Sequence, residues 1–587
     1  MAISFQPRET LEAALRAAAV RVDGLGSDFD PSVRPSDPRF GDFQANGVLP
    51  RAKELKVPPR PLAQALLDAV LADNSLDPAH FVLELAGPGF LNIRLQPAFL
   101  DAWLTSFRDE NSFRRGAQTT LAGRRIVVDF SSPNTAKEMH VGHIRSTVIG
   151  EAIARLLEFC GAQTVRDNHI GDWGTQFGML IWAVKERGYD LHGDHENPIA
   201  DLEALYKHGH AHYKSDPAAA EAMRAELVKL QSGDPENTKI WKDIWNISWK
   251  AFEVIYKRLG IHFDEVLGES FYRDQVAAVC AELEQCGLAV ESEGALVVFH
   301  PDHPRFATQP FIVRKADGAS NYATTDLATI LYRLEHFRAD EILYVVDSRQ
   351  SDHFEQLFLT THAWFAATNR KVPALRHISF GTILGEDRRP IKTKEGGSAK
   401  LRALVNEAVE RARRVVDEKS PDLPPEERAT IAEAVGLGAV RYADLSQNRT
   451  SDYIFCWEKM LALEGNTAPY LLYAVARLHS IFRKAATSPD GAFTNAAPLE
   501  SAAECALARK LAAFPGALEQ MLADYRPHVL CSYLFELAGV FSSFYNAEKV
   551  IVDEEPVRER RLRLCARTLR TLETGLHLLG LRTLERM

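Results

Sequence analysis

"RRIVVDFSSPNTAKEMHVGHIRSTVIGEAIARLLEFCG" occupies residues 124–161 and predicts a strand, a loop and a helix in that order. The first seven residues contain the apolar run IVV, which is typical of a strand buried on both faces. Apolar residues spaced by three and four then form one helical stripe, consisting of Ile149, Ile153, Leu156, Leu157 and Cys160. Gly161 suits the position just after a helix, and AQTVRD begins a second strand pattern. The segment therefore predicts the start of a β-α-β unit.

Two later segments extend the predicted sheet. EILYVVD (residues 341–347) and HISFGTILG (residues 377–385) are rich in β-branched and aromatic residues, and helical patterns separate them. Strands that alternate with helices favour a Rossmann-like, doubly wound parallel sheet. Such sheets bind their ligands at the carboxyl ends of the strands. We therefore expect an α/β domain whose ligand site includes the residues that follow each strand.

The 587 residues are too many for one hydrophobic core, and the patterns divide the chain into three parts. Residues 1–115 contain helical stretches, a Pro-rich turn and the hairpin pattern FVLELAGPGFLNIRL, which predict an α+β domain. RDENSFRRGAQTTLAGR after it has the composition of a linker. Residues 120–430 hold the sheet pattern, with a polar, helix-like insertion at about 190–262. Residues 431–587 are helical almost throughout and predict an all-α helix bundle.

The composition excludes several classes of protein. No run of 18 or more apolar residues exists, which excludes a membrane span, and the N-terminus lacks the pattern of a signal peptide. The seven cysteines form no C-x-x-C pair, so we expect neither a disulfide framework nor a cysteine zinc site. A cytoplasmic location fits this pattern.

The charge is unevenly distributed. The net charge is 69 − 79 = −10, which argues against a general nucleic-acid coat. Residues 557–587 nevertheless hold eight Arg against three Glu. This stretch could attract a polyanion, or it could be a solvated helix face.

His140 and His143 stand three residues apart where the predicted helix begins. Such a pair can bind a metal ion, but no third ligand with zinc spacing lies nearby in the sequence, so we assign no metal. The two side chains could also be core histidines with satisfied hydrogen bonds. A helix N-terminus offers free N–H groups and a positive dipole to phosphates, and Gly142 permits close approach of a nucleotide. We favour phosphate binding, because imidazoles there can stabilise charge that grows in a transition state.

HVGH resembles the HIGH signature of class I aminoacyl-tRNA synthetases, and SSPNTAKEMHVGHIRSTVIG resembles the bacterial arginyl-tRNA synthetases in particular. The resemblance covers nearly the whole chain, in NHIGDWGTQFGMLI, LVKLQSGD, LGES, YATTDLA, YVVDSRQSDHF, FGTILGED, SQNRTSDYIF and EGNTAPYLLYA. It implies an arginine–tRNA ligase that works in two steps. L-Arginine would attack ATP, with Mg²⁺ on the phosphates, to give arginyl-adenylate and pyrophosphate. The terminal adenosine of tRNA(Arg) would then accept the arginyl group.

The resemblance also implies a site for free arginine. Carboxylates suit both its guanidinium fork and its α-ammonium group. By resemblance, the residues that hold the guanidinium are Glu269, Tyr322 and Asp326. Those that hold the α-amino end are Asp129, Asn134 and Gln350. Tyr322 and Asp326 are four residues apart, so one helical turn would place their side chains together.

ATP would lie over the HVGH turn and beside a segment similar to the family's GDWG. By resemblance the nucleotide contacts are His140, Gly142, His143, Gly171, Asp172, Trp173 and Gly174. The second class signature, KMSKS, is degenerate in GEDRRPIKTKEGGSAKL, where Lys392 and Lys394 occupy its place in an ambiguous register. The resemblance assigns the missing charge to Lys137, just before HVGH. We therefore expect His140, His143 and Lys137 to act in catalysis, through positioning and charge stabilisation.

The outer parts of the chain resemble tRNA-binding domains. By resemblance, Phe90 and Asn92 of the first domain would contact the tRNA D-loop, where an unstacked base needs a ring and a hydrogen-bonding neighbour. Tyr545 and Met587 would contact the anticodon region, and the Arg-rich last segment would contact phosphates. The expected partners are L-arginine, ATP and tRNA(Arg), with no membrane, and we expect a monomer.

Two alternatives remain at this point. Another class I synthetase would need a different pocket: zinc-binding cysteines for cysteine, or basic residues in place of Glu269, Tyr322 and Asp326 for glutamate. A non-catalytic tRNA-binding relative should have lost His140, His143 or the acidic pocket, and all of these are present.

Overall fold

The chain forms two compact units in the computed structural model, which describes residues 3–587 except 73–74, 317–321, 390, 392–398 and 492. One unit joins Met1–Thr120 with Ala462–Met587, and the other is Leu121–Leu461. The predicted boundary at residues 430 and 431 falls inside helix α16 (Pro425–Leu445), which belongs to the second unit. Within the described residues, no helix has the length and apolar character needed to span a membrane.

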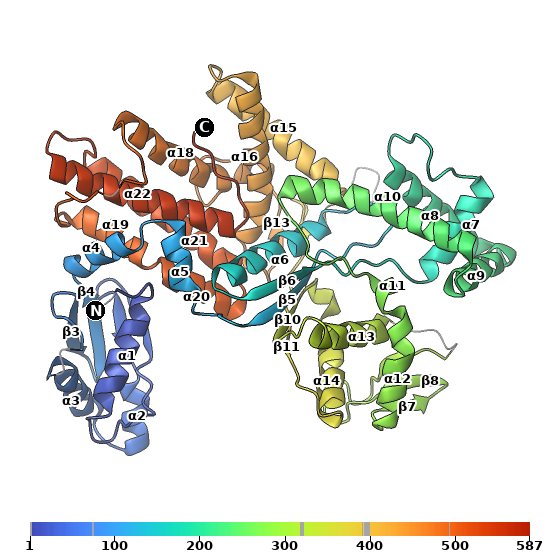
Figure 1. The fold of residues 1–587 in the computed structure, drawn as a ribbon, viewed down its shortest axis with the longest axis horizontal. Coiled ribbons are helices and arrows are strands. Elements are labelled where there is room, and N and C mark those ends of the chain that lie inside the picture. Colours follow the sequence, from blue (N-terminus) through green and yellow to red (C-terminus); the bar gives the residue numbers. More distant parts are fainter. Residues whose placement is uncertain (1–2, 73–74, 317–321, 390, 392–398, 492) are drawn as a thin grey trace. The chain divides into compact units, whose positions relative to one another are not determined.

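The second unit is built on the parallel sheet that the sequence predicts. Its strands run in the order β11-β10-β5-β6, namely Ala374–His377, Glu341–Val345, Arg125–Phe130 and Gln163–Asp167. All neighbouring pairs are parallel. Helix α6 (Gly142–Phe159) connects β5 to β6, whereas β10 and β11 lie on the other side of β5 (Figure 1). The strand order therefore reverses between β5 and β10, which is where a doubly wound sheet binds ligands.

The predicted strand at residues 377–385 is wrong in its bounds. The last strand of the sheet, β11, ends at His377, and β12 (Ile383–Leu384) pairs instead with β13 (Tyr453–Ile454). Gly381 explains the division, since its N–H donates to Arg449 O at 2.9 Å and an added Cβ would lie 2.6 Å from Asp452 Oδ1. The chain leaves the sheet at this close approach, which the apolar pattern does not reveal.

The predicted polar insertion forms helices that pack beside α7 (Thr175–Arg187), as Figure 1 shows. They are α8 (Pro198–Ser215), α9 (Pro217–Gln231) and α10 (Pro235–Leu259). The carboxylates of Asp216 and Asp234 accept backbone N–H groups and cap α9 and α10. The insertion is therefore a folded helical layer of the second unit.

The remaining elements of the second unit surround the parallel sheet. An antiparallel sheet that the sequence patterns did not predict contains β7, β8 and β9, at Ala289–Ser292, Ala295–Val298 and Phe311–Arg314. The helices are α11 (Glu269–Tyr272), α12 (Val276–Gln285), α13 (Tyr322–Glu335), α14 (Ser351–Ala367), α15 (Leu401–Lys419) and α17 (Trp457–Met460). Leu327 of α13 and Trp364 of α14 belong to one buried core with Ile342 of β10. This shared core fixes α13 and α14 on the sheet.

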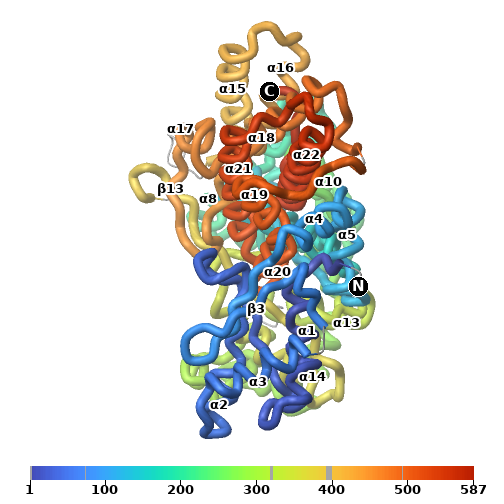
Figure 2. The backbone as a smooth tube through the Cα atoms, turned by 90° about the vertical axis from the view of Figure 1, so that its left-hand side faces the viewer, coloured from blue at the N-terminus to red at the C-terminus, as the bar shows by residue number. Residues whose placement is uncertain are grey.

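The first unit begins with an α+β fold that contains the predicted hairpin. Strands β3 (Phe81–Ala86) and β4 (Phe90–Leu95) pair in an antiparallel sheet of order β1-β2-β4-β3. Strands β1 (Val33–Pro35) and β2 (Phe43–Ala45) were missed, because they are short and lie in the predicted Pro-rich turn. The accompanying helices, of which Figure 2 shows α1 and α3 near β3, are α1 (Pro7–Ala19), α2 (Val48–Leu55) and α3 (Pro59–Ala72).

The predicted linker is instead partly helical. Helix α5 (Glu110–Ala117) begins with a capping box in which Asp109 Oδ1 accepts the N–H of Ser112 at 2.7 Å. Phe113 of this helix is fully buried and packs against Phe5 and Trp103. The charged residues that suggested a linker therefore form only the outer face of an amphipathic helix.

A helix bundle completes the first unit, as predicted. Its helices are α18 (Ala468–Lys484), α19 (Ala502–Ala512), α20 (Phe514–Asp524), α21 (Pro527–Ala547) and α22 (Glu555–Leu578). Helix α22 packs against α18, α19 and α21 (Figure 2), and against α4 (Pro97–Ser106).

The Arg-rich last segment mainly supports this bundle. Arg560, Arg563 and Arg567 on α22 are buried. Arg560 Nε pairs with Glu504 at 3.0 Å, Arg563 pairs with Asp101, and Arg567 donates to a backbone carbonyl. Neither alternative drawn from the sequence, a phosphate-binding stretch or a solvated face, describes these three side chains. The charges are used internally because a buried guanidinium requires acceptors.

Candidate active site

The predicted site residues of the second unit gather where the strand order reverses. Asp129 lies near the end of β5, directly opposite Tyr344 of β10. Gln350 follows β10 in a single 3₁₀ turn (Ser348–Gln350) and is exposed. The β5 loop carries Asn134 and leads into the HVGH turn at the start of α6. The sheet topology thus brings segments more than 200 residues apart to one edge.

Asp129 belongs to a buried ion cluster that the sequence did not reveal. Its Oδ2 accepts from Arg333 Nη2 at 2.7 Å, and the same nitrogen lies 2.7 Å from Asp167 Oδ2. Burial alone would lower the pKa of the Arg333 guanidinium, but the two carboxylates raise it well above its usual range. Asp129 Oδ1 accepts from the hydroxyl of Ser132 at 3.0 Å. A carboxylate has about four acceptor positions, so Asp129 retains capacity for another donor.

The loop after β5 has an unusual backbone. Ser131, Ser132 and Ala136 all adopt positive φ, at 74°, 45° and 59°. Between them Thr135 N donates to Gly171 O at 3.0 Å, and Gly171 N donates to Pro133 O at 3.1 Å. A Cβ on Gly171 would lie only 2.0 Å from the side-chain oxygen of Asn134. Glycine at this position is therefore required for Asn134 to occupy its place beside GDWG.

Hydrogen bonds fix the orientation of the two histidines. The N–H of Gly142 donates to His140 Nδ1 at 3.0 Å, and the N–H of His140 donates to His143 Nδ1 at 3.0 Å. Burial lowers the pKa of both rings, with neighbouring cations adding to the effect on His140, and that of His143 falls to about 3. A neutral imidazole whose Nδ1 accepts must carry its proton on Nε2. His140 is thus an uncharged donor through Nε2–H. His143 Nδ1 also lies 3.3 Å from His140 O, and we assign the same tautomer to His143 from the shorter bond that its Nδ1 accepts from the His140 N–H.

The expectation that free backbone N–H groups of this turn bind phosphate is wrong. Val141 N donates to Ala399 O at 2.8 Å, and Gly142 N donates to His140 Nδ1. The next two N–H groups, of His143 and Ile144, donate to His140 O and Val141 O. These four N–H groups are already paired, so the imidazole Nε2–H groups are the donors that the turn offers to a phosphate.

Several cations lie around the HVGH turn. The charges that act on His140 come from Lys400, Arg349 and Lys137. Lys137 Nζ lies 4.5 Å from the ring centroid of Tyr206. Lys400 pairs with Glu203 and lies 3.4 Å from Glu138. Of the candidate signature lysines, Lys392 and Lys394 lie outside the described residues.

Asp172 connects the GDWG segment to the LGES segment. Its Oδ1 accepts the N–H of Ser270 at 2.8 Å, and its Oδ2 accepts the Ser270 hydroxyl at 2.7 Å. A Cβ on Gly268 would lie 2.6 Å from this carboxylate. The buried Asp172 carboxylate therefore holds the LGES segment at Ser270, next to Glu269 in the chain.

The neighbouring residues Trp173 and Gly174 lead into α7. Trp173 packs edge-on against Trp241, and the guanidinium of Arg273 lies 5.3 Å from the centre of the Trp173 ring. Gly174 has φ +121° and is the residue before α7 begins. This backbone conformation favours glycine.

Glu269 is a half-buried acid whose ionisation is affected by other acids. Burial raises its pKa to about 7; Asp326 and Asp172 add to the increase, and His169 opposes it. The negative charges of Asp326 and Asp172 therefore both oppose ionisation of the Glu269 carboxyl. A cation placed beside the Glu269 carboxyl would favour its ionised form.

Tyr322 and Asp326 lie one turn apart at the start of α13, as their spacing predicts. His353 of α14 contacts both: its Nε2 lies 2.6 Å from Asp326 Oδ2, and its ring lies 4.9 Å from that of Tyr322. The sequence reasoning missed His353 and Arg333 as members of the site. The quoted segment YVVDSRQSDHF contains His353, but no spacing rule connects α13 to α14.

The predicted tRNA contacts lie in the first unit. Phe90 begins β4 beside the turn at Gly87 and is half-buried, whereas Asn92 is buried and its side-chain oxygen accepts from Gln44 Nε2 at 2.7 Å. Tyr545 on α21 is 37% exposed and packs near Phe541. Met587 is half-buried. Phe90 and Tyr545 therefore present more accessible side chains than Asn92.

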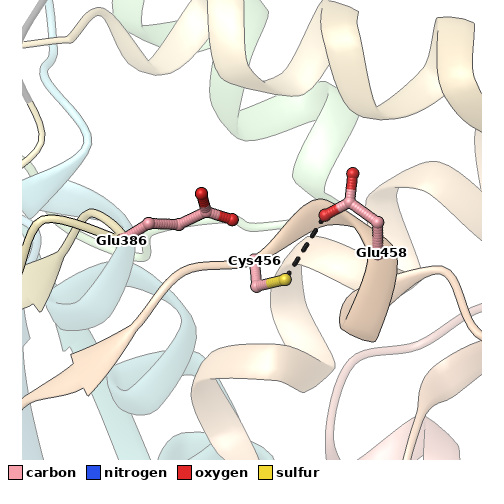
Figure 3. A group of neighbouring side chains, drawn as sticks. All are labelled: Glu386, Cys456 and Glu458. Carbon is pink, nitrogen blue, oxygen red and sulfur yellow. Dashed lines mark hydrogen bonds between the residues drawn. The ribbon is translucent and has the colours of Figure 1, made fainter.

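Three potential metal ligands approach each other elsewhere in the second unit. Glu386, Cys456 and Glu458 place one ligand atom each within 4.8 Å of the others (Figure 3). Cys456 Sγ donates to Glu458 Oε2 at 3.3 Å, and both glutamates are exposed. Exposed acids of this kind are ordinary surface groups, and no function is assigned to the cluster.

Three protein-family models match successive parts of the chain. Residues 111–457 match the family model described as "tRNA synthetases class I (R), catalytic domain". Residues 471–587 match the "DALR anticodon binding domain". Residues 7–95 match the "Arginyl tRNA synthetase N terminal domain".

Individual relatives are similar over almost their full length. A curated "Arginine--tRNA ligase" from an Enterobacter species is 45% identical over 96% of this chain and 97% of its own. One from Cellvibrio japonicus is 44% identical over 97% of this chain and 98% of its own. The solved structure of Thermus thermophilus arginyl-tRNA synthetase is similar with a TM-score of 0.82 at 27% identity, covering 99% of this chain and 100% of that chain.

Proposed function

The chain belongs to the arginyl-tRNA synthetase family of class I, and from this premise we propose how its residues perform the reaction of an arginine–tRNA ligase. ATP activates L-arginine as arginyl-adenylate, and the arginyl group then passes to the terminal adenosine of tRNA(Arg). The observation that carries the proposal is the β5 loop, which runs from the Asp129 carboxylate near the end of β5 to the His140–His143 pair at the start of α6. Substrate and nucleotide would meet along this loop.

The acidic residues would bind the two cationic ends of arginine. Glu269, Asp326 and Tyr322 would hold the guanidinium, since two carboxyls with a phenol match its planar array of donors. Asp129 with its remaining acceptor capacity would hold the α-ammonium group, together with Asn134 and Gln350. Arg333 keeps the Asp129 carboxylate in one orientation. The α-carboxylate of arginine would then face the HVGH turn.

The His140 and His143 Nε2–H groups would donate to the phosphates as the arginine carboxylate attacks the α-phosphorus. Because the rings are neutral and already oriented, they can stabilise the growing charge with little reorganisation. Lys137 would place its ammonium near the departing pyrophosphate, and Lys392 or Lys394 could share this role. The backbone of Gly142, Gly171 and Gly174 would allow the nucleotide to approach, with Trp173 alongside and Asp172 holding the neighbouring loop. Mg²⁺ would enter with ATP and neutralise phosphate charge, and we assign no side chain to it.

The rest of the chain would bind tRNA. We assign residues 1–115 to the D-loop, residues 120–430 to catalysis and residues 431–587 to the anticodon region. Phe90 and Tyr545 would stack on unstacked bases, with Asn92 and Met587 beside them. We propose that the protein acts as a cytoplasmic monomer, which sedimentation of the free protein and of its tRNA complex would test.

Exchange of pyrophosphate into ATP tests the function directly. The full-length protein should catalyse exchange only with L-arginine when each amino acid is supplied in turn. We expect the rate to depend on added tRNA(Arg), because family members generally require it for the first step. Exchange driven by another amino acid would contradict the proposal.

A further inference from the structure

His353 is a largely buried neighbour of the proposed arginine pocket, and the proposed reaction gives this histidine no role. It lies on the first turn of α14, and its side chain is 11% exposed. Its Nε2–H donates to Asp326 Oδ2 at 2.6 Å, a close contact between an N–H group and a carboxylate. Rings of Tyr322, Phe311 and Phe354 lie within 6.0 Å of the imidazole. The ring therefore has few orientations available.

This contact changes what the Asp326 carboxylate can do. The last torsion of an aspartate side chain is broad, so an unrestrained carboxylate rotates easily. A donor fixed on Oδ2 limits rotation of the group and so sets the plane in which both of its oxygens lie. A guanidinium fork requires this plane to be correct, because its parallel N–H groups have a rigid geometry. An ammonium group is a point charge with rotatable donors, and it tolerates a rotated carboxylate.

We propose that His353 is a positioning residue that makes the pocket select arginine's guanidinium over the ammonium of lysine, by fixing the plane of the Asp326 carboxylate and the ring of Tyr322. The inference rests on the proposed assignment of Tyr322 and Asp326 to the guanidinium. His353 is not placed in contact with substrate. Its effect reaches the substrate through Tyr322 and Asp326, which are assigned to the guanidinium.

The test uses full-length His353→Ala and His353→Gln in arginine-dependent pyrophosphate exchange with tRNA(Arg) present. His353→Ala should raise KM for arginine by about 10-fold or more, as expected for loss of a hydrogen bond to a charged group. Its kcat should stay within about 3-fold, since the phosphate-binding residues are untouched. The inhibition constant of L-lysine should change by less than about 2-fold, so the preference for arginine falls. His353→Gln retains an N–H donor and should restore most of the affinity.

His303 provides a matched control, because it also pairs with a carboxylate of α14. Its Nε2 lies 3.1 Å from Glu355 Oε1 of α14, and its ring stacks on Phe306 at 4.7 Å. This histidine–carboxylate pair lies outside the residues assigned to the pocket, so His303→Ala should leave KM and kcat unchanged. An unchanged KM in His353→Ala would overturn the inference, as would equal losses for arginine and lysine. If His353→Ala does not fold, failure of folded His353→Gln to keep its affinity would also overturn it. Failure of the unaltered protein to use arginine would instead overturn the proposed function.

Discussion

Burial and neighbouring charges act on the ionisation of the Glu269 carboxyl group, and not all in the same direction. Burial removes water from it, and the carboxyls of Asp326 and Asp172 repel its negative form, whereas His169 favours that form. The result is a pKa raised to about 7, so this acid is partly protonated at neutral pH. A guanidinium bound beside it would favour the ionised form. Arginine binding and loss of a proton should therefore be coupled.

We expect KM for arginine to fall as pH rises from about 5.5 to 7 and to level off above about 8. The direction follows because the protonated acid lacks the charge that binds the guanidinium, and binding at low pH must first release the proton. KM measured by pyrophosphate exchange across this range tests the coupling. Glu269→Gln should remove the pH step and raise KM about 10-fold or more at pH 8. A KM independent of pH between 6 and 8 would exclude the coupling.

At the residue scale the sequence could supply the types of side chain in the site, but only some of their partners. HVGH, LGES and the Tyr322–Asp326 spacing identified histidines and acids of the second unit, which we assign to the site. The partner of Asp129, Arg333, lies 204 residues away, and no local pattern marks it. The use of the backbone N–H groups in the HVGH turn also depends on Ala399, which a helix-start pattern cannot indicate.

At the scale of elements, the contact between the β5 loop and GDWG depends on the absence of a side chain at Gly171. Gly171 does not need positive φ, so its requirement is one of space. Two backbone hydrogen bonds hold the segments together on either side of Asn134. They run from the N–H of Thr135 to Gly171 O and from the N–H of Gly171 to Pro133 O. Any side chain at residue 171 must displace Asn134 or separate the segments. Either change moves a group assigned to the α-amino end of arginine.

Gly171→Ala should lower kcat/KM for arginine by about 10- to 100-fold, because a small misplacement of a positioning group is costly in catalysis. Steady-state pyrophosphate exchange measures the loss. Gly539→Ala is the matched control: Gly539 lies within α21, and apart from the adjoining chain and helix backbone no atom of the described residues lies within 4 Å of an added Cβ. That variant should keep full activity and gain up to about 1 kcal/mol of stability. Equal activities of the two variants would refute the steric explanation.

The elements that the sequence predicted well are those whose burial is regular. Strand β5, helix α6 and the hairpin β3–β4 have continuous or alternating apolar patterns, which agree with the structure. The errors have other causes. Strand β1 is three residues long, α5 buries little more than one face, and the segment after β11 turns at Gly381 because of a distant backbone contact. Sequence patterns do not reveal an element that is very short or whose bounds are set by tertiary contacts.

At the scale of the whole molecule, each compact unit contains its own buried ion cluster. The second unit has Arg333 between Asp129 and Asp167. The first has Glu504, which accepts from Arg560 and Arg561 and also completes the capping box of α19. Removing one member of such a cluster leaves an uncompensated buried charge. Variants in the two clusters should therefore report on the two units separately.

Differential scanning calorimetry should resolve two transitions, because the two units have separate cores. Arg333→Met should lower one of them by about 5 °C or more, reflecting a loss of about 3–5 kcal/mol. Glu504→Gln should lower the other. Lys371→Ala is the control, since its pair with Asp340 is exposed and such pairs contribute about 0–1 kcal/mol. One transition that both variants shift equally would show that the units unfold together.

The positive φ values in the β5 loop limit which sequences this family member can accept. Left-handed backbone favours glycine, asparagine and aspartate and strongly disfavours β-branched residues. Ala136 is fully enclosed, so only glycine could replace it without displacing neighbours, whereas the Ser131 hydroxyl bonds Tyr256 at 2.8 Å. The backbone conformation of the run SSPNTA thus restricts which amino acids it can contain, independently of any ligand. A library that randomises this loop would recover few folded members, even under selection for binding alone.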